Sequence, residues 1–153
     1  MNLLIVEDDE DKRDQLIDFV NDKLATQFSE VRSFQSGLKS IKTTLFDLIL
    51  LDMTMPTFDI NSSESGGRSQ SFGGELLMFE MTRREIPSKV IVVTQFDLFG
   101  EGEYEINLKD LDTRLQKQFP LNYVGAVQYH ISYTGWKDVL VEMIKETGLP
   151  ILK

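Results

Sequence analysis

The sequence predicts an α/β fold in which five parallel strands form one doubly wound sheet with helices on both faces. Short apolar runs alternate with amphipathic stretches along the chain, five times in all, in a (βα)5 order. The runs are apolar throughout, which is typical of strands that are buried on both faces of a sheet. Right-handed crossovers between such strands place helices on both faces.

The first strand and helix are expected within residues 3–24. Residues 3–6 form an apolar run that is too short for a helix, so we expect a buried strand there. From Glu10 onward the apolar residues take a helical spacing, and the acids in the first turn suit the positive end of a helix dipole. The apolar stripe consists of Leu16, Ile17, Phe19, Val20 and Leu24.

The second and third units follow the same alternation with weaker signals. Residues 31–34 are expected to form a short edge strand, and residues 36–45 a helix. Residues 48–51 form a clearly apolar run and predict a buried strand. Residues 57–74 are rich in Ser, Gly and Asn without periodicity, which predicts a long surface loop. A helical pattern resumes over residues 75–84 and stops before a proline.

The fourth and fifth units complete the predicted sheet. Residues 89–94 predict a buried strand, followed by an irregular stretch over residues 96–105. Leucines and a phenylalanine at helical spacing predict a helix over residues 108–119. Residues 126–131 predict the last buried strand, and residues 139–144 lie in the last amphipathic helix.

Composition narrows the class of protein. The chain has 153 residues, of which 41% are hydrophobic, so we expect a single domain over residues 1–153. Its net charge of −9 disfavours contact with phosphate backbones, so no nucleic-acid partner is expected. No apolar run reaches the ~18 residues of a membrane span, so no membrane partner is expected either. The absence of cysteine and of a signal peptide fits a cytoplasmic protein.

Polar residues follow the predicted strands where each strand ends. Glu7 and Asp8 follow the first strand, Asp52 the third, Thr94 the fourth and Ser132 the fifth. Ligands of open parallel sheets bind outside the carboxyl ends of the strands, so we expect these side chains to converge. The sequence therefore predicts a site built from three carboxylates and hydroxyl groups.

Clustered carboxylates repel one another unless a proton or a cation lies between them. Mg²⁺ resolves this repulsion with oxygen ligands, and a carboxylate beside it can attack phosphorus. The run of acids at residues 7–11 has a second interpretation, in which Asp8 and Asp9 cap a solvated helix start. Composition alone does not choose between these interpretations.

Four motifs together resemble those of response-regulator receiver domains. They are LIVEDD at residues 4–9, LLDMTMP at residues 50–56, VVT at residues 92–94 and GAVQY at residues 125–129. Each motif alone is weak, but all four occur in the family's order on a matching strand pattern. The resemblance covers most of the chain and implies the receiver or flavodoxin-like fold.

The resemblance also implies roles for individual residues. Asp52 matches the phosphoacceptor, which in the family ends the third strand and precedes x-x-Met-Pro. Thr94 matches the hydroxyl residue that ends the fourth strand. Tyr129 matches the family's switch aromatic, although simple packing is an equal alternative for this ring.

The implied metal is Mg²⁺. The family's acidic pair matches Glu7 and Asp8, and the metal is held by the second acid, the phosphoacceptor and a backbone carbonyl two residues later. These positions are Asp8, Asp52 and Thr54. The resemblance therefore predicts a metal site formed by Glu7, Asp8, Asp52 and Thr54.

The sequence departs from the family in two respects. Receiver domains carry a lysine three residues after the switch aromatic, where this chain has Ser132, which donates a neutral hydrogen bond but no charge. A charge-assisted hydrogen bond is worth roughly 1.5–3 kcal/mol. Lys137 lies near this position in the sequence and is a candidate to replace the missing lysine.

The segments after Pro56 and Thr94 are also longer than the family pattern. Three interpretations remain open for them: they cover the site as a lid, they bind a partner, or they are tolerated surface loops.

The function that these observations favour is a stand-alone receiver. We expect a histidine kinase or a phosphotransfer protein to phosphorylate Asp52 with Mg²⁺ bound. With no output domain expected, the signal passes to a downstream effector by protein–protein contact, and a homodimer is an additional option. Phe119, Tyr129 and Trp136 are the candidate contact residues.

Two other functions remain as alternatives. A degenerate pseudo-receiver would act as a phosphorylation-independent binding module, and Ser132 in place of a lysine favours it. A phosphohydrolase of the haloacid dehalogenase type needs a second Asp where this chain has Thr54. We therefore do not expect an enzyme.

Overall fold

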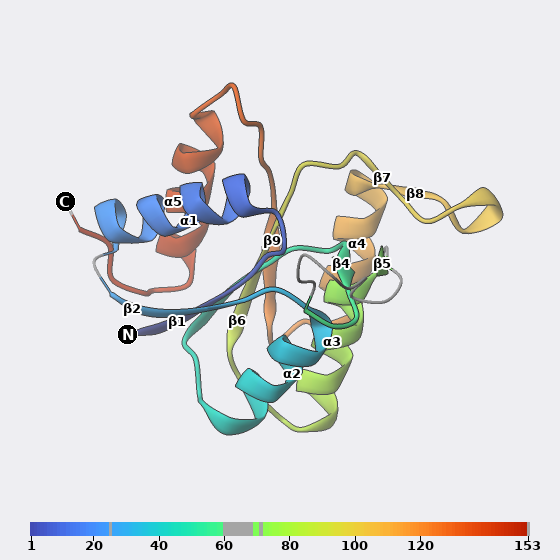
Figure 1. Cartoon of the computed structure of the whole chain (residues 1–153), viewed down its shortest axis with the longest axis horizontal. Coiled ribbons are helices and arrows are strands. Elements are labelled where there is room, and N and C mark those ends of the chain that lie inside the picture. The colour runs from blue at the N-terminus through green and yellow to red at the C-terminus, as the bar shows by residue number, and fades with distance from the viewer. Residues whose placement is uncertain (25, 60–68, 71, 153) are drawn as a thin grey trace.

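The computed structural model describes residues 1–24, 26–59, 69–70 and 72–152. Its centre is a parallel five-stranded sheet with the strand order β2-β1-β3-β6-β9 (Figure 1). The predicted doubly wound sheet is therefore confirmed. The strands are β1 (Asn2–Val6), β2 (Gln27–Val31), β3 (Leu48–Leu51), β6 (Lys89–Thr94) and β9 (Tyr123–Gln128).

Helices cover both faces of this sheet, as Figure 1 shows. α1 (Glu10–Lys23) and α5 (Gly135–Glu146) lie on one face. α2 (Phe34–Thr43), α3 (Gly73–Arg83) and α4 (Leu108–Gln118) lie on the other. None of the helices in the described part of the chain is long and apolar enough to cross a membrane.

The order of the strands creates a switch point between β1 and β3. From β1 the chain runs outward to β2, and it then returns to form β3 on the opposite side of β1. Crossovers that leave in opposite directions open a crevice at the carboxyl ends of these two strands. The candidate site is therefore expected at the ends of β1 and β3.

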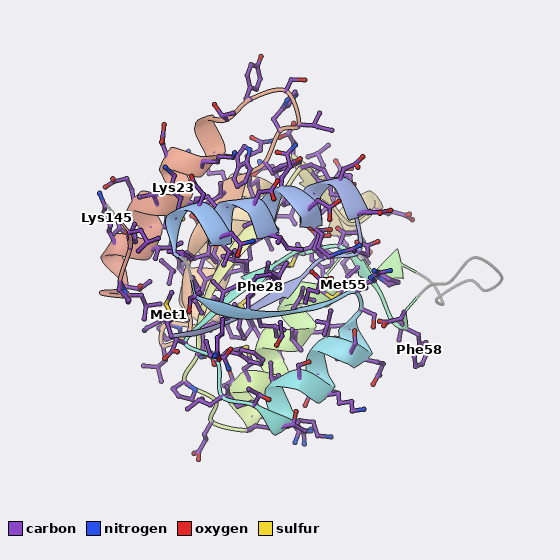
Figure 2. The ribbon with its side chains drawn as sticks, turned by 60° about the vertical axis from the view of Figure 1, so that its left-hand side comes forward. Met1, Lys23, Phe28, Met55, Phe58 and Lys145 are labelled. Atoms are coloured by element: carbon purple, nitrogen blue, oxygen red, sulfur yellow. The ribbon has the colours of Figure 1, made fainter. Side chains whose placement is uncertain are left out.

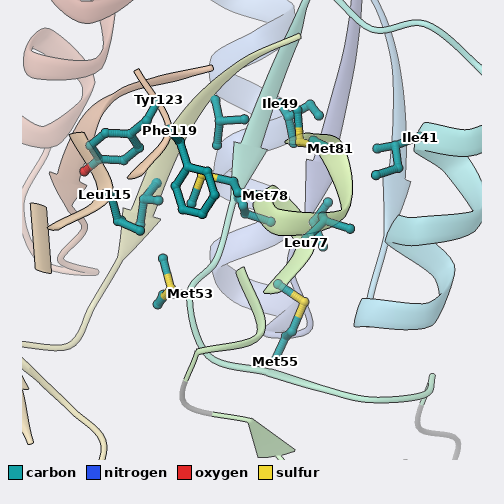
Figure 3. Packing of buried hydrophobic residues seen from close by; sticks show 14 of the residues in the cluster. Ile41, Ile49, Met53, Met55, Leu77, Met78, Met81, Leu115, Phe119 and Tyr123 are labelled. Atoms are coloured by element: carbon teal, nitrogen blue, oxygen red, sulfur yellow. The ribbon is translucent and has the colours of Figure 1, made fainter. Parts of the chain in front are cut away.

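Side chains of the central strands alternate between two apolar clusters, because successive residues of a strand face opposite sides. The cluster under α2, α3 and α4 includes Met78 and Phe119, and Figure 3 shows them packed beneath the sheet. The cluster under α1 and α5 includes Phe19 and Trp136. Residues of the five-stranded sheet in the first cluster are Leu4, Val6, Ile49, Leu51, Val90, Val92 and Tyr123. Strand residues of the second are Leu3, Ile5, Leu48, Leu50, Ile91, Val93 and Val127.

The ends of α1 and α5 lie together at the end of the molecule that is remote from the crevice. Figure 2 shows Lys23 and Lys145 near each other there, with Phe58 at the opposite end. The backbone N–H of Leu152 donates a 2.8 Å hydrogen bond to the carbonyl of Lys23. The last residues of the chain are thereby attached to the first helix.

Two strands differ from the sequence prediction in their bounds. β2 spans residues 27–31 instead of 31–34, because it is an edge strand with mostly exposed residues and lacks a continuous apolar run. β9 spans residues 123–128 instead of 126–131. The prediction of residues 129–131 as strand was wrong, since the chain leaves the sheet after Gln128, although Tyr129 N–H still donates to the Thr94 carbonyl at 2.8 Å.

Each segment that was expected to be irregular contributes one strand to a short antiparallel pair. β4 (Met55–Pro56) pairs with β5 (Ser69–Gln70), and residues 60–68 and 71 of this predicted loop lie outside the described residues. β7 (Leu98–Phe99) pairs with β8 (Ile106–Asn107), and the connection contains a short 3₁₀ turn over Gly102–Tyr104. The second pair projects from the body of the molecule (Figure 1).

The start of α3 packs directly on the end of β3. Gly74 N–H donates a 2.9 Å hydrogen bond to the carbonyl of Met53. A Cβ atom at Gly74 would lie 2.7 Å from the carbonyl oxygen of Asp52 and 3.1 Å from the Cα of Met53. Only glycine therefore lets the helix approach the strand end this closely.

Substitution Gly74→Ala is expected to lower the free energy of unfolding by about 1–3 kcal/mol, because the added methyl group overlaps the backbone of Asp52. Urea denaturation measures the change. Gly135→Ala is the matched control, since a Cβ atom there meets nothing within 4 Å, and it should be neutral or slightly stabilising. A Gly74→Ala variant as stable as the native chain would contradict the close approach.

Candidate functional site

Three carboxylates meet at the switch point of the sheet. Glu7 directly follows β1 and Asp52 directly follows β3, and Asp52 N–H donates a 3.0 Å hydrogen bond to the carbonyl of Val6. The ladder between the two strands therefore continues into the site and holds both acids side by side. Carboxylate oxygens of Glu7, Asp8 and Asp52 all lie within 4.8 Å of one another. We call these three residues the acidic triad.

Members of the acidic triad differ in their exposure. The side chains of Glu7 and Asp52 are only 1% and 4% exposed, whereas Asp8 is exposed. Asp9 has a different task, because its side chain accepts a 3.2 Å hydrogen bond from Lys12 N–H and caps α1. The capping interpretation is thus confirmed for Asp9, while Asp8 belongs to the triad.

A buried lysine from α1 reaches into the triad. Lys12 is 1% exposed, and its Nζ lies 2.5 Å from Glu7 Oε1 and 3.4 Å from Asp52 Oδ1. The same Nζ donates a 2.6 Å hydrogen bond to the carbonyl of Val93. One ammonium group therefore contacts residues that follow or belong to three neighbouring strands, β1, β3 and β6.

The sequence analysis did not identify Lys12. The four residues directly before Lys12 are all acidic, and a charged residue in such a run at a helix start is expected to face solvent. The missed signal is helical spacing, since Lys12 lies four residues before the buried Leu16 and is therefore on the inward face of α1. Arg13 is buried on the same face, and its guanidinium donates a 3.3 Å hydrogen bond to the carbonyl of Glu7.

Burial and mutual repulsion raise the pKa values of the triad. Burial, reinforced by the charge of Asp52, raises the pKa of Glu7 to about 8 despite the nearby Lys12. Burial likewise raises the pKa of Asp52 above its ordinary value. Asp8 is exposed overall, yet loss of water around its carboxyl group and the charge of Glu7 raise its pKa to about 6.

Lys12 stays charged in this environment. Burial alone would lower the pKa of its ammonium group, but the charges of Asp52 and Glu7 outweigh that effect and raise the pKa above its ordinary value. One ammonium ion cannot neutralise three carboxylates. The site therefore retains a proton or takes up a further cation.

The other sequence-predicted residues lie around the triad at different depths. Thr94 is fully buried at the end of β6, and its Oγ1 accepts a 3.1 Å hydrogen bond from Phe96 N–H. Thr54 is half-buried in the turn between β3 and β4. Ser132 is exposed in the loop before α5, where its N–H donates a 3.1 Å hydrogen bond to Nδ1 of His130.

Tyr129 lies between Lys12 and the last helix. The Nζ of Lys12 is 6.0 Å from the centre of the Tyr129 ring, and that ring is 5.2 Å from the ring of Trp136. Trp136 in turn lies 5.9 Å from the ring of Phe19 on α1. An aromatic row therefore extends from the site into the cluster under α1 and α5.

The three residues expected to contact a partner are buried instead. Phe119, Tyr129 and Trp136 are 2%, 5% and 4% exposed. Their large apolar surfaces fill the two clusters of the core, as large aromatic side chains commonly do. The prediction of these residues as contacts was wrong.

A pocket of about 340 Å³ adjoins the site on the side of α1. The pocket is lined by Asp9, Asp11, Lys12, Gln95, Tyr129, His130 and Ile131. Lys12 is therefore shared between the acidic triad and this pocket.

The acidic triad fits a divalent cation of the hard, oxygen-seeking kind. Three carboxylate oxygens meet within 4.8 Å, and Mg²⁺ prefers one or two carboxylates together with waters. The exposed Asp8 leaves one side open to water. Because the pKa values of Glu7 and Asp8 are raised, a cation that binds these carboxylates would compete with protons for them.

Comparison with known proteins places this geometry in context. No family model matches the chain. The uncharacterized protein y4jR of Sinorhizobium fredii (strain NBRC 101917 / NGR234) is 33% identical over 143 residues, which is 92% of this chain and 94% of that protein. The Detocs response regulatory protein DtcB of Enterobacter cloacae (strain JD6301) is 28% identical over 149 residues, or 95% of this chain and 99% of that protein.

Solved structures show the same fold at lower identity. One is the receiver domain of the sensor histidine kinase PA1611 from Pseudomonas aeruginosa PAO1, with a magnesium ion coordinated in its active site cleft. It aligns with a TM-score of 0.62 and 15% identity, and the alignment covers 96% of this chain and 97% of that one. The acidic triad resembles the Mg²⁺ site of such domains.

Without divalent cations, the free energy of unfolding is expected to fall as the pH rises from 6 to 8. The pKa of Glu7 is raised from 4.5 to about 8, so the folded chain keeps a proton that the unfolded chain loses above pH 4.5. Stability from this group is complete below pH 4.5 and is lost as the pH approaches 8. Urea denaturation at several pH values, with EDTA, measures the slope.

The variant Glu7→Gln is the control for this pH dependence. It removes the titrating carboxyl group, so its stability should change less between pH 6 and pH 8 than that of the native chain. Added Mg²⁺ should stabilise the native chain more at pH 8 than at pH 6, because fewer protons compete with it. Equal slopes for the two proteins would show that the buried carboxyl group does not retain a proton.

Proposed function

The chain belongs to the same family as the y4jR protein and has the receiver fold of response regulators, and from this premise we propose that it is a stand-alone receiver phosphorylated on Asp52. The observation that supports this proposal most directly is that the ammonium group of Lys12 contacts two carboxylates of the acidic triad. The three carboxylates and the ammonium group meet at the strand ends, where they would serve as nucleophile, cation ligands and a fixed positive charge.

In the proposed reaction, a carboxylate oxygen of Asp52 attacks the phosphorus atom of a phosphohistidine. An O–P bond forms and the N–P bond breaks, and its electron pair stays on the imidazole nitrogen, which takes a proton from water. The product is an acyl phosphate on Asp52 and a free histidine on the donor. Asp52 suits this role because the strand ladder holds its backbone and α3 packs against its carbonyl.

The remaining residues would bind and orient the reacting group. Glu7, Asp8 and Asp52, with the backbone carbonyl of Thr54, would hold Mg²⁺. When bound, Mg²⁺ would neutralise charge on the phosphoryl oxygens. Thr94 is the last residue of β6, the strand next to β3, so its buried hydroxyl would donate to one of these oxygens.

The phosphohistidine would come from a histidine kinase or a phosphotransfer protein, and a downstream effector would receive the signal by direct contact. Exposed apolar side chains support such contacts near the site. Ile131 and Tyr133, in the loop between β9 and α5, are 62% and 67% exposed, and Val139 on α5 is 47% exposed. These residues take the place of the buried aromatics as candidate contacts.

The protein should form a single phosphoryl adduct when it is incubated with acetyl phosphate and Mg²⁺. Intact-mass spectrometry detects the adduct, which should survive acid and be lost in mild base, as an acyl phosphate is. Asp52→Asn should form no adduct. Asp14→Asn is the matched control, because Asp14 is exposed on α1 and should react as the native chain does.

Absence of any adduct, together with unchanged Trp136 fluorescence on addition of beryllofluoride, would contradict the proposal. The phosphorylation-independent binding module would then be the better interpretation. Rapid hydrolysis of unrelated phosphate esters would instead favour a phosphohydrolase.

A further inference from the structure

We propose that Lys12 binds the phosphoryl group on Asp52, and so supplies from the first helix the charge that receiver domains take from a lysine after the fifth strand. This inference rests on the proposed function, since it concerns the same reaction. In the part of the chain that the structure describes, Lys12 is the one basic side chain with an ion pair to Asp52.

The position of Nζ supports this role. It lies 3.4 Å from Asp52 Oδ1, so an oxygen of a group attached to Asp52 falls within its reach. Its other two contacts, to Glu7 Oε1 at 2.5 Å and to the carbonyl of Val93 at 2.6 Å, hold the ammonium group in place. The side chain is already ordered and desolvated, so little conformational entropy is lost when it binds a phosphoryl oxygen.

Charge balance requires a cation that stays in the site. Ionised Asp52 carries one negative charge, whereas its acyl phosphate carries about two at neutral pH. Phosphorylation therefore adds a negative charge next to Glu7 and Asp8 in a buried site. Lys12 offsets part of this charge at close range, where the low dielectric makes the interaction strong.

Neither residue near the family's lysine position supplies this charge in the structure. Ser132 is exposed, and its backbone N–H is bonded to the ring of His130. The Nζ of Lys137 lies over the ring of Trp136, 5.7 Å from its centre. The positive charge at the triad thus comes from Lys12 of α1 and not from either of these two positions.

Lys12 also touches the residue at the switch position. Its Nζ lies 6.0 Å from the centre of the Tyr129 ring, which packs on Trp136. A change in the partners of Nζ is therefore expected to alter the surroundings of the Tyr129 and Trp136 rings. Trp136 is the only tryptophan of the chain, so its fluorescence reports on this change.

The test compares Lys12→Met with Lys137→Met in the full chain. With acetyl phosphate and Mg²⁺, the rate of adduct formation should fall roughly 10- to 100-fold in Lys12→Met, because a charge-assisted hydrogen bond in the transition state is lost. Lys137→Met should react at the native rate. Lys12→Arg keeps the charge with a different geometry and should react faster than Lys12→Met.

A second readout separates this role from a general loss of structure. Lys12→Met keeps the acidic triad and loses a competing cation, so it should bind Mg²⁺ at least as tightly as the native chain by isothermal titration. Slow phosphorylation together with intact Mg²⁺ binding supports the proposal. Native-like phosphorylation of Lys12→Met, or an equal loss in Lys137→Met, would overturn it. Failure of the native chain itself to react would instead refute the proposed function.

Discussion

The ammonium group of Lys12 holds together two buried carboxylates that would otherwise repel each other. Glu7 and Asp52 lie at the ends of adjacent strands, where the sheet ladder does not let them move apart. A single buried charge, unpaired, costs several kcal/mol. The contacts of Lys12 to both acids and to the Val93 carbonyl therefore permit the two strand ends to meet in a buried site.

The same constraint explains why the surrounding elements approach so closely. α1 begins with the cap of Asp9, which sets the direction from which Lys12 enters the site. On the other side, Gly74 brings the start of α3 against the carbonyl of Asp52. The nucleophile that we propose is thus enclosed by rigid elements, while the exposed Asp8 keeps one side open to solvent and to a cation.

Because Lys12 of α1 contacts Asp52, a charged residue in the loop after β9 would not be needed for this contact. In the role that we propose for Lys12, Ser132 and its neighbours would not carry the charge, and the loop between β9 and α5 would be free to present its exposed residues Ile131 and Tyr133. Contact between Lys12 and Tyr129 keeps the site connected to the cluster under α1 and α5.

The sequence by itself determined the order of strands and helices, because apolar runs that are buried on both faces leave a pattern that is visible residue by residue. It also determined that Glu7, Asp8 and Asp52 meet, since parallel strands end at one edge. The edge strand β2 was predicted with the wrong bounds and the pairs β4–β5 and β7–β8 were missed, because short strands with mixed residues leave no such pattern. Only the tertiary structure decided that Lys12 is buried and Tyr129 enclosed, because a charged side chain enters a core only when distant residues supply its partners.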